Sequence, residues 1–475
     1  MQGHHNRQQD LFITSVDINS LIPEDHFLRK IDQLLDLSFV YELTAPFYNQ
    51  GKGRPSIDPE VFIRMLLVEY FYKIPSDREL CRQLQYNLAY KWFCGLSLLD
   101  KVPDHSSITR VRDRFGEDTF KKIFQKVLEV CCEKGLVKGE RLLVDGSLFN
   151  ADASFSSLVE RSSGDNPIDD IKIDNEHLDS SKKNKISGKR FSNDKHVSKT
   201  DPDATIAGKQ GERKRLRYKA HYTADADSRV VVDCHVTTGS TSEVKVFQGR
   251  VEAIADELNI KPKEIIADRG YGSAKNLEYL DEKKIESNIP LWSRRSGAKV
   301  LEEFKKGFIY DSNNQEAKCP AGHKMDYSYQ ELNDRVVFKV INKICKVCPK
   351  KEFCYLDSQT AKDRGRRLSI PLSLDIFLKT KEKETDPIFK SKLRERMWKI
   401  EGLFAEAKSW HGMGRAKYRR RSKVQIQIYM TATVQNIKRM IKANVFDLIK
   451  ELLGMSKYQK KQKKFFKYLN SYFSY

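Results

Sequence analysis

The sequence has no apolar run that approaches the length of a membrane span. A transmembrane helix needs ~20 consecutive apolar residues, and charged residues, 32% of the chain, interrupt every apolar stretch before that length. The first twelve residues, MQGHHNRQQDLF, also lack the apolar segment of a signal peptide. These absences exclude an integral membrane protein and predict a soluble, cytoplasmic protein with no membrane partner.

Cysteine is scarce, with 9 residues in a chain of 475, so a disulfide framework is excluded. Four of the nine gather between residues 319 and 354 and are candidate metal ligands. The other five fall singly or as a pair in helical or strand patterns and are expected in the core: Cys81, Cys94, Cys131, Cys132 and Cys234.

Acidic residues are outnumbered by basic ones, 65 against 86, which gives a formal net charge of +21. Such an excess indicates a polyanionic partner, with nucleic acid as the first candidate. An anionic membrane surface is the rival, and the lack of any membrane-spanning apolar run counts against it. A chain of 475 residues is also too long for one ordinary core, so two or three domains are expected.

Residues 1–135 predict an all-α N-terminal domain. One helix follows the candidate caps Ser56 and Asp58, with Pro59 in its first turn. A second begins at Ser76, and Glu79 three residues later completes a capping-box pattern.

Two further helices in this domain are expected to break near Gly116 and stop near Gly135. Arg110, Arg112 and Arg114 follow one another at alternate positions on the first of them. Short helices with tight turns resemble a helix-turn-helix module, in which Arg110 and Arg112 would contact DNA. The alternative is a helical bundle with a solvated basic face.

From residue 136 to 300, strand patterns alternate with helical ones, which indicates an α/β sheet. Within this part, residues 154–215 are polar and charge-mixed and predict a long loop, largely disordered or ordered only on binding. Residues 301–385 hold the cysteine cluster, and residues 386–450 read as two long helices. The tail, 451–475, is basic and aromatic: it is either an electrostatic arm for nucleic acid or a solubilising segment.

Two predicted strands end on a carboxylate. Leu142–Val144 precede Asp145, Ile265–Ala267 precede Asp268, and a glycine follows within two residues of each acid. Carboxyl ends of strands in α/β sheets commonly carry sites, and adjacent carboxylates repel each other unless they share a cation. Mg²⁺ suits such oxygen ligands, so the pair predicts a magnesium site, while a solvated strand end is the plainer interpretation of either acid alone.

A third acid, Glu401, lies in a late helical segment. Arg394, Glu401 and Lys408 are spaced by seven residues and fall on one helical stripe. Cations on both sides of an acid suit a site for metal and phosphate. An exposed helix with salt bridges has the same pattern.

The order Asp145, Asp268, Glu401 resembles the acidic triad of bacterial insertion-sequence transposases of the DDE class. The segments LLVDGSLFNADAS, IIADRGYGS and IEGLFAEAKSWHGMG resemble the stretches that carry the three acids, and GRPSIDPEVFIRMLLVEYFYKI resembles the N-terminal domain. The resemblance covers about residues 15–445. Glu401 and Lys408 match the spacing of a signature of one large branch, but Arg394 and Met397 stand where that branch has Tyr and Arg.

The resemblance implies an RNase H-like mixed sheet flanked by helices, with an all-α N-terminal domain and a small Cys-rich β insertion. It also implies cleavage of transposon ends and joining of the 3′-hydroxyl to target DNA with two Mg²⁺ ions, for which Mn²⁺ can substitute. Lys408 and Arg394 would contact DNA, and the enzyme would act as a homodimer on terminal repeats, associated with the nucleoid. Asp152, seven residues after Asp145, lies past the predicted strand and is expected to play no catalytic part. The alternatives are an inactive, domesticated DNA-binding protein and a plain nuclease of the same fold.

The cysteine cluster has a spacing that suits zinc. Cys345 and Cys348 form a C-x2-C pair, and Cys319 and Cys354 complete four thiolates, with His323 as a substitute ligand. Reduced thiols in a small β insertion and an iron–sulfur cluster are the alternatives. A zinc ion here would be structural.

Overall fold

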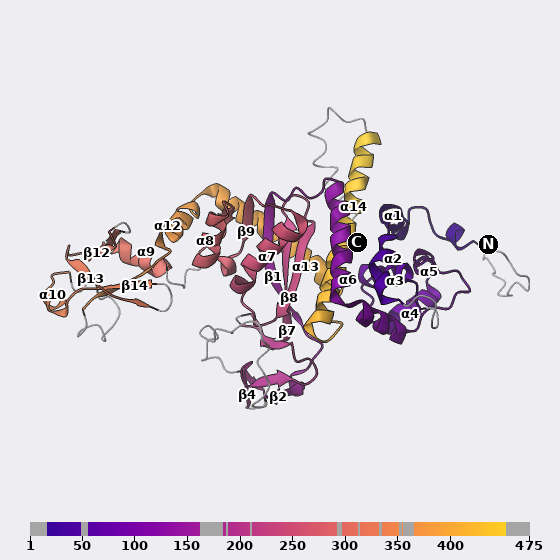
Figure 1. Ribbon diagram of the computed structural model, residues 1–475, viewed down its shortest axis with the longest axis horizontal. Helices are drawn as coiled ribbons and strands as arrows, with labels where there is room; N and C mark the ends of the chain where they lie inside the picture. The colour runs from indigo at the N-terminus through magenta and orange to yellow at the C-terminus, as the bar shows by residue number, and fades with distance from the viewer. Residues whose placement is uncertain are drawn as a thin grey trace, which may run out of the picture.

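The computed structural model describes residues 17–48, 56–161, 184–186, 189–209, 211–291, 297–311, 314–331, 335–350, 354 and 365–452. The molecule is elongated (Figure 1): N-terminal helices lie at one end, a mixed sheet in the middle, and a second, smaller sheet at the other end. The predicted tail beyond residue 452 lies outside the described residues.

The N-terminal region is helical, as predicted. Asp58 caps α3 by accepting hydrogen bonds from the amides of Glu60 and Val61, and the Ser76 hydroxyl accepts one from the Glu79 amide at the start of α4. The predicted break at Gly116 is confirmed, because its φ of 68° and ψ of 177° kink the last helix. The elements are η1 (Ile18–Leu21), α1 (Phe27–Leu34), α2 (Phe39–Thr44), η2 (Ala45–Phe47), α3 (Pro59–Phe71), α4 (Asp77–Tyr86), α5 (Leu88–Phe93) and α6 (His105–Glu133).

The central sheet has six strands: β1 (Arg141–Asn150), β6 (Thr205–Ala207), β7 (Arg215–Asp225), β8 (Val231–Thr238), β9 (Glu264–Ala267) and β10 (Glu286–Asn288). β1 pairs antiparallel with β7, and β7 pairs antiparallel with β8 and β6. On its other side β1 pairs parallel with β9, which pairs parallel with β10. Without β6, the strands lie side by side in the order β8-β7-β1-β9-β10. Counted along the chain from one to five, this is the order 3-2-1-4-5 of an RNase H-like sheet, so the predicted fold class is confirmed.

Helices cover both faces of this sheet. On one face lie α13 (Pro387–Trp410) and α14 (Arg421–Leu452), and the Phe404 ring of α13 stacks on Tyr222 of β7 with centroids 4.7 Å apart. On the other lie α7 (Glu243–Leu258) and α8 (Ala274–Glu282); Arg250 of α7 pairs with Asp233 of β8. Side chains alternate between the faces along a strand, so Asp145, opposite Tyr222, is on the α13 face.

Two sequence predictions about this domain are wrong. β1 continues past Asp145 to Asn150, because β7 is long enough to pair with it down to Arg217. Residues 154–215 are also not one structureless loop: their described parts form η3 (Phe155–Ser157), β2 (Leu158–Glu160), β3 (Asn184–Ile186), β4 (Lys189–Phe191), β5 (His196–Ser198) and β6. Polar side chains here are held inside, as when buried Asp201 accepts a 2.7 Å hydrogen bond from the Tyr218 hydroxyl.

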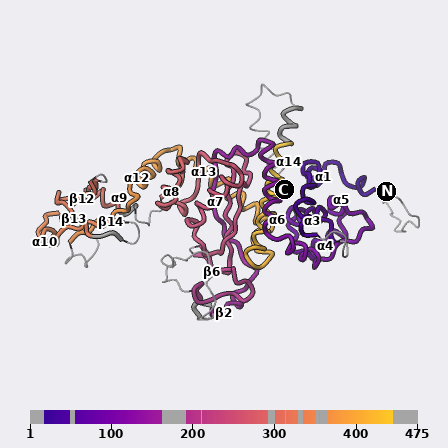
Figure 2. Tube along the Cα trace, viewed as in Figure 1, coloured from indigo at the N-terminus to yellow at the C-terminus, as the bar shows by residue number. Residues whose placement is uncertain are grey.

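The predicted Cys-rich β insertion is present and lies at the opposite end of the molecule from the N-terminal helices (Figure 2). It has a core of its own, built on residues such as Val300, Met325 and Phe338. Its five strands are antiparallel and follow one another in chain order, and it begins with a helix slightly before the predicted residue 301. The elements are α9 (Gly297–Lys305), β11 (Ile309–Asp311), β12 (Glu316–Lys318), β13 (Lys324–Glu331), β14 (Arg335–Lys339), α10 (Asn342–Lys346), β15 (Arg367–Pro371) and α12 (Leu374–Lys383).

Helix α14 joins the N-terminal region to the sheet and runs beside α6 (Figure 1). Tyr429 stacks on Phe124 of α6 with centroids 5.9 Å apart, and Gln425 accepts a 2.6 Å hydrogen bond from the Val236 amide of β8. One core therefore runs through both parts. Among the described residues, no helix is long and apolar enough to cross a membrane.

Candidate active site

Asp145 and Asp268 occupy equivalent places on neighbouring strands. The last residue pair between β1 and β9 is Val144 with Ala267, and each aspartate is the next residue along the chain: Asp145 within β1, and Asp268 directly after the end of β9. Each carboxylate accepts a 2.8 Å hydrogen bond from a nearby glycine amide, that of Gly146 or Gly270. The structure thus brings together the two acids that the sequence singled out.

The surroundings of both acids disfavour their charge. Burial raises the pKa of Asp145 to about 6, and repulsion by Asp268 and Glu401 acts in the same direction. Burial is also the largest cause of the raised pKa of Asp268. Because only 15% of the Asp145 side chain is exposed, a cation is the partner that would stabilise its ionised form.

Arg396 supplies one such cation. Its Nη1 lies 3.3 Å from Oδ2 of Asp145, and its side chain is 11% exposed. This positive charge opposes the rise in the pKa of Asp145. Arg396 is not part of the family signature, but it lies one turn before the buried Ile400 on the helix, and a cation on an apolar stripe is the signal that could have identified it.

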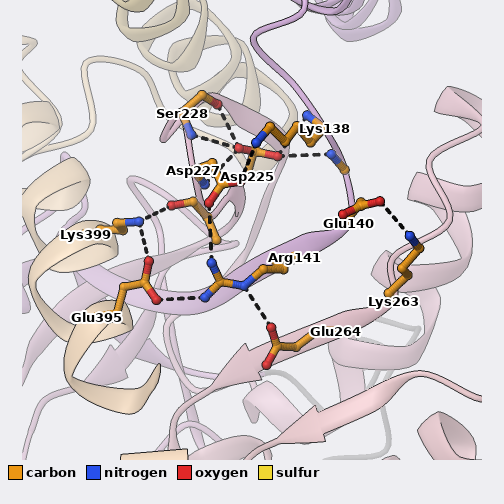
Figure 3. Close-up of polar contacts among 12 residues, drawn as sticks. Lys138, Glu140, Arg141, Asp225, Asp227, Ser228, Lys263, Glu264, Glu395 and Lys399 are labelled. Carbon is orange, nitrogen blue, oxygen red and sulfur yellow. Dashed lines mark hydrogen bonds and ion pairs between the residues drawn. The ribbon is translucent and has the colours of Figure 1, made fainter. Parts of the chain in front are cut away.

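Polar contacts fix helix α13 along β1. Arg141, at the start of β1, donates to Glu264 of β9 at 2.9 Å and to Glu395 of α13 at 2.7 Å, and Lys399 donates to Glu395 (Figure 3). Further along both elements, Lys408 Nζ donates to Ser147 Oγ at 2.7 Å and to the Leu148 carbonyl at 3.0 Å. The helix and the strand therefore run in the same direction.

Glu401 lies on α13 between these contacts. It is exposed, it shares a stripe with Lys408 seven residues later, and its charge contributes to the raised pKa of Asp145. The structure thus places all three predicted acids on one side of the domain. Across the described residues, however, no three Asp, Glu, His or Cys side chains are grouped closely enough to hold a metal ion.

The donor set of the three acids suits magnesium. All three are carboxylates, the ligands that Mg²⁺ prefers, and two of them are largely buried side by side. A guanidinium already attracts one carboxylate of the pair. The residues present therefore fit a divalent cation by their chemistry.

The predicted DNA-binding residues have different surroundings. Lys408 is half-buried, and burial lowers its pKa, with Lys209 and Arg217 adding repulsion. Arg394 is exposed and has no polar partner within the described ranges, and Arg110 is exposed and bonds to Ser106 and Ser107.

The prediction for Arg112 is wrong. Its side chain is 2% exposed, and its guanidinium donates to both carboxylate oxygens of Asp77 at 3.0 and 2.6 Å. It is a structural cation inside the protein. Alternate arginines on a helix fall on different faces, so Arg112 turns inward while Arg110 and Arg114 remain exposed.

An ion pair that sequence reasoning missed lies near the acids. Lys219 Nζ is 2.6 Å from Glu243 Oε1, and Glu243 adds to the raised pKa of Asp268. Neither residue stands out in the sequence, because β7 and the start of α7 meet only in the folded sheet.

The four thiols of the insertion lie in one region. Cys319 and Cys354 are buried in the small core, and Cys345 packs against it. Burial raises the pKa of Cys354, and the thiols of Cys348, Cys319 and Cys345 add to this effect. Four thiols match the ligand chemistry of zinc, although the described thiols do not form a closed metal site.

Family models match most of the chain. Residues 16–114 match a transposase domain (DUF772), and residues 177–437, more than half of the chain, match the transposase DDE domain. This chain belongs to the transposase DDE domain family. The DDE transposase is thus an enzyme of DNA cleavage and strand transfer. The family uses divalent metal ions, usually Mg²⁺. The alternative of an inactive, domesticated DNA-binding protein is not favoured.

Asp268 and Glu401 of the transposase lie within the matched range, whereas Asp145 lies between the two ranges. No curated protein matches the sequence. A solved structure, the piggyBac transposase synaptic complex with hairpin DNA, aligns with 93% of this chain and 82% of its own at 10% identity and a TM-score of 0.30.

Proposed function

We propose that Asp145, Asp268 and Glu401 are the acidic triad of this DNA transposase and bind two Mg²⁺ ions, or Mn²⁺ in their place. The observation that carries the proposal is the register of β1 and β9, which sets Asp145 and Asp268 directly after the last pair of their strands. Asp145, on the central strand, is the proposed bridging ligand. Asp268 would hold one ion and Glu401 the other.

Two bound metal ions would activate the attacking oxygen and stabilise the charge on the leaving oxygen. The residues of the chain contribute position: Asp145 and Asp268 are fixed by the sheet and by the Gly146 and Gly270 amides, and α13 holds Glu401 along β1. Water would cleave the transposon end first, and the freed 3′-hydroxyl would then attack target DNA. Lys408 would contact a phosphate beside the cut.

Three further features belong to this proposal. The enzyme would act as a homodimer, because two terminal inverted repeats have to be cut together, and Arg394 and Arg110 would contact the duplex. One Zn²⁺ held by Cys319, Cys345, Cys348 and Cys354 would stabilise the insertion. Since the substrate is chromosomal DNA, the protein would work in the cytoplasm on the nucleoid.

A cleavage assay tests the triad. The protein is incubated with labelled duplex that carries the repeats flanking its coding region, with Mg²⁺ or Mn²⁺, and cut ends and joined products are resolved on a gel. Asp145→Asn, Asp268→Asn and Glu401→Gln should each lose at least about a thousandfold in rate, equivalent to several kcal/mol of transition-state stabilisation. Glu252→Gln, an exposed acid of α7, is the control. Cleavage that persists in any triad variant contradicts that residue's assignment.

A further inference from the structure

A cavity of about 570 Å³ lies where the N-terminal helices meet the catalytic domain. Its lining comes from α3, the start of α4, the first half of α6, and four segments outside the N-terminal helices: Asp152, Lys199 with Thr200 and Pro202, the segment 417–420, and Lys423 of α14. It is separate from the three acids, and none of the residues predicted to bind DNA contributes to it except Arg112, which is part of its floor.

Basic side chains predominate in the lining, and the acids there already have partners. Glu69 pairs with Lys417 at 2.7 Å, Asp77 with Arg112 at 2.6 Å, and Asp113 with Lys423 at 2.8 Å. The fourth acid, Asp152, pairs with Arg415 at 2.8 Å and with Arg419 at 3.1 Å. No lining acid is therefore left to neutralise the remaining cations.

Those remaining cations are Arg78, Lys199 and Arg420. All three are exposed, and none forms an ion pair with a carboxylate in the part of the chain that the structure describes. They come from three segments far apart in the sequence: α4, the stretch after β5, and the residue directly before α14. Cations spread around the mouth of a cavity fit an extended polyanion better than one small anion.

Side chains from both parts of the molecule contact one another in the floor of the cavity. The Arg112 guanidinium lies 4.3 Å from the centre of the Tyr418 ring, and the Tyr418 hydroxyl is 3.5 Å from that of Tyr70. Lys417 Nζ also donates to the Ile74 carbonyl at 2.7 Å. These contacts join the two parts of the molecule, so a ligand would meet a surface that needs little ordering on binding.

The cavity also adjoins the strand of Asp145. Asn150, the last residue of β1, exchanges backbone hydrogen bonds with Gly414 at 3.2 Å and Ala416 at 2.7 Å, next to Arg415. Five residues of strand, at about 3.3 Å each, separate Asn150 from Asp145, or roughly 16 Å. A duplex that lies across the cavity is long enough to reach the acids.

We propose that this cavity binds the phosphate backbone of double-stranded DNA through Arg78, Lys199 and Arg420. The inference rests on the proposed function, because it assigns a second contact to the same DNA substrate. Each cation that neutralises a phosphate releases counterions from the duplex, so binding through these residues depends on salt.

The test uses the full-length protein and a fluorescein-labelled duplex of arbitrary sequence, with polarisation measured over a series of KCl concentrations. The triple variant Arg78→Gln, Lys199→Gln, Arg420→Gln should bind at least about tenfold more weakly at physiological salt. The slope of log K against log[salt] should become shallower by about 2 to 3. The single variant Lys199→Gln, with a slope change of about 1, serves if the triple variant fails to fold.

The control carries the same loss of charge elsewhere: Lys122→Gln, Lys134→Gln, Lys275→Gln, three exposed lysines on α6, after it and on α8. An unchanged slope in the cavity variants, or an equal loss in the control, overturns the inference. Wild-type protein that binds this duplex, and that cleaves labelled terminal repeats in the gel assay described above, shows that such a failure concerns the cavity and not the transposase function.

Discussion

Arg396 of α13 and Asp145 of β1 form an ion pair at 3.3 Å, in which both side chains are largely buried. The pair couples the helix that bears Glu401 to the central strand. A guanidinium and a divalent metal ion would be attracted to the same carboxylate, so Arg396 either competes with the metal or withdraws as it binds.

Replacement of Arg396 should therefore change how the protein responds to metal. Mn²⁺ should raise the melting temperature of the wild type, because a ligand that binds the folded state stabilises it, by about 2.7 kcal/mol at a hundred times Kd. Arg396→Gln should show a larger increase than the wild type, and Asp145→Asn a smaller one. Arg394→Gln, on the exposed side of the same helix, is the control. An equal increase in Asp145→Asn and the wild type would contradict the metal assignment.

Zinc in the insertion can be tested by metal analysis. Purified protein should contain about one zinc ion per chain, and Cys348→Ser should contain far less, because a structural site needs four ligands. Chelation should also lower the thermal stability of the wild type but not that of Cys348→Ser. Cys132→Ser, at an exposed thiol outside the insertion, is the control. Wild-type protein purified without zinc and equally stable would favour reduced thiols.

Arg112 should matter for stability and not for DNA contact. Arg112→Met leaves Asp77 as an unpaired acid with 14% exposure, and breaking a buried ion pair typically costs about 3–5 kcal/mol. Urea denaturation of the variant measures the loss. The double variant Arg112→Met, Asp77→Leu should recover part of it. By contrast, Lys263→Ala breaks an exposed pair with Glu140, 74% and 55% exposed, and should leave the urea midpoint nearly unchanged, because exposed ion pairs contribute little to stability.

Two histidines face each other across β7 and β8, His221 and His235. The pKa of His235 is lowered to about 4, chiefly by burial and also by the charge of Arg250, while Asp233 acts in the opposite direction. Between about pH 6.5 and 4, this histidine is therefore protonated in the unfolded chain and neutral in the folded one. The stability present above about pH 6.5 is lost as the pH falls toward 4. Between pH 6.5 and 4, the free energy of unfolding of His235→Gln should therefore fall by about 2 kcal/mol less than that of the wild type. Identical pH profiles in urea denaturation would contradict this expectation.

The sequence was most informative where a local pattern has a local cause. The caps at Asp58 and Ser76 and the kink at Gly116 depend on neighbouring residues, and all were predictable. Asp145 and Asp268 were predictable as candidates because each interrupts an apolar strand. The end of β1 was not, since it depends on how far β7 extends beside it. Nor was the inward turn of Arg112, whose partner Asp77 lies 35 residues away.

The shared helix α14 has a consequence for how the protein is made. The core of the N-terminal region includes residues of α14 from Val424 onward. Val424 is synthesised 291 residues after Glu133, the end of α6. At ~5–20 residues per second, that is a wait on the order of 15–60 s. During synthesis the first helices therefore expose the apolar surface that α14 later covers, and the N-terminal half completes its fold only when translation is nearly finished.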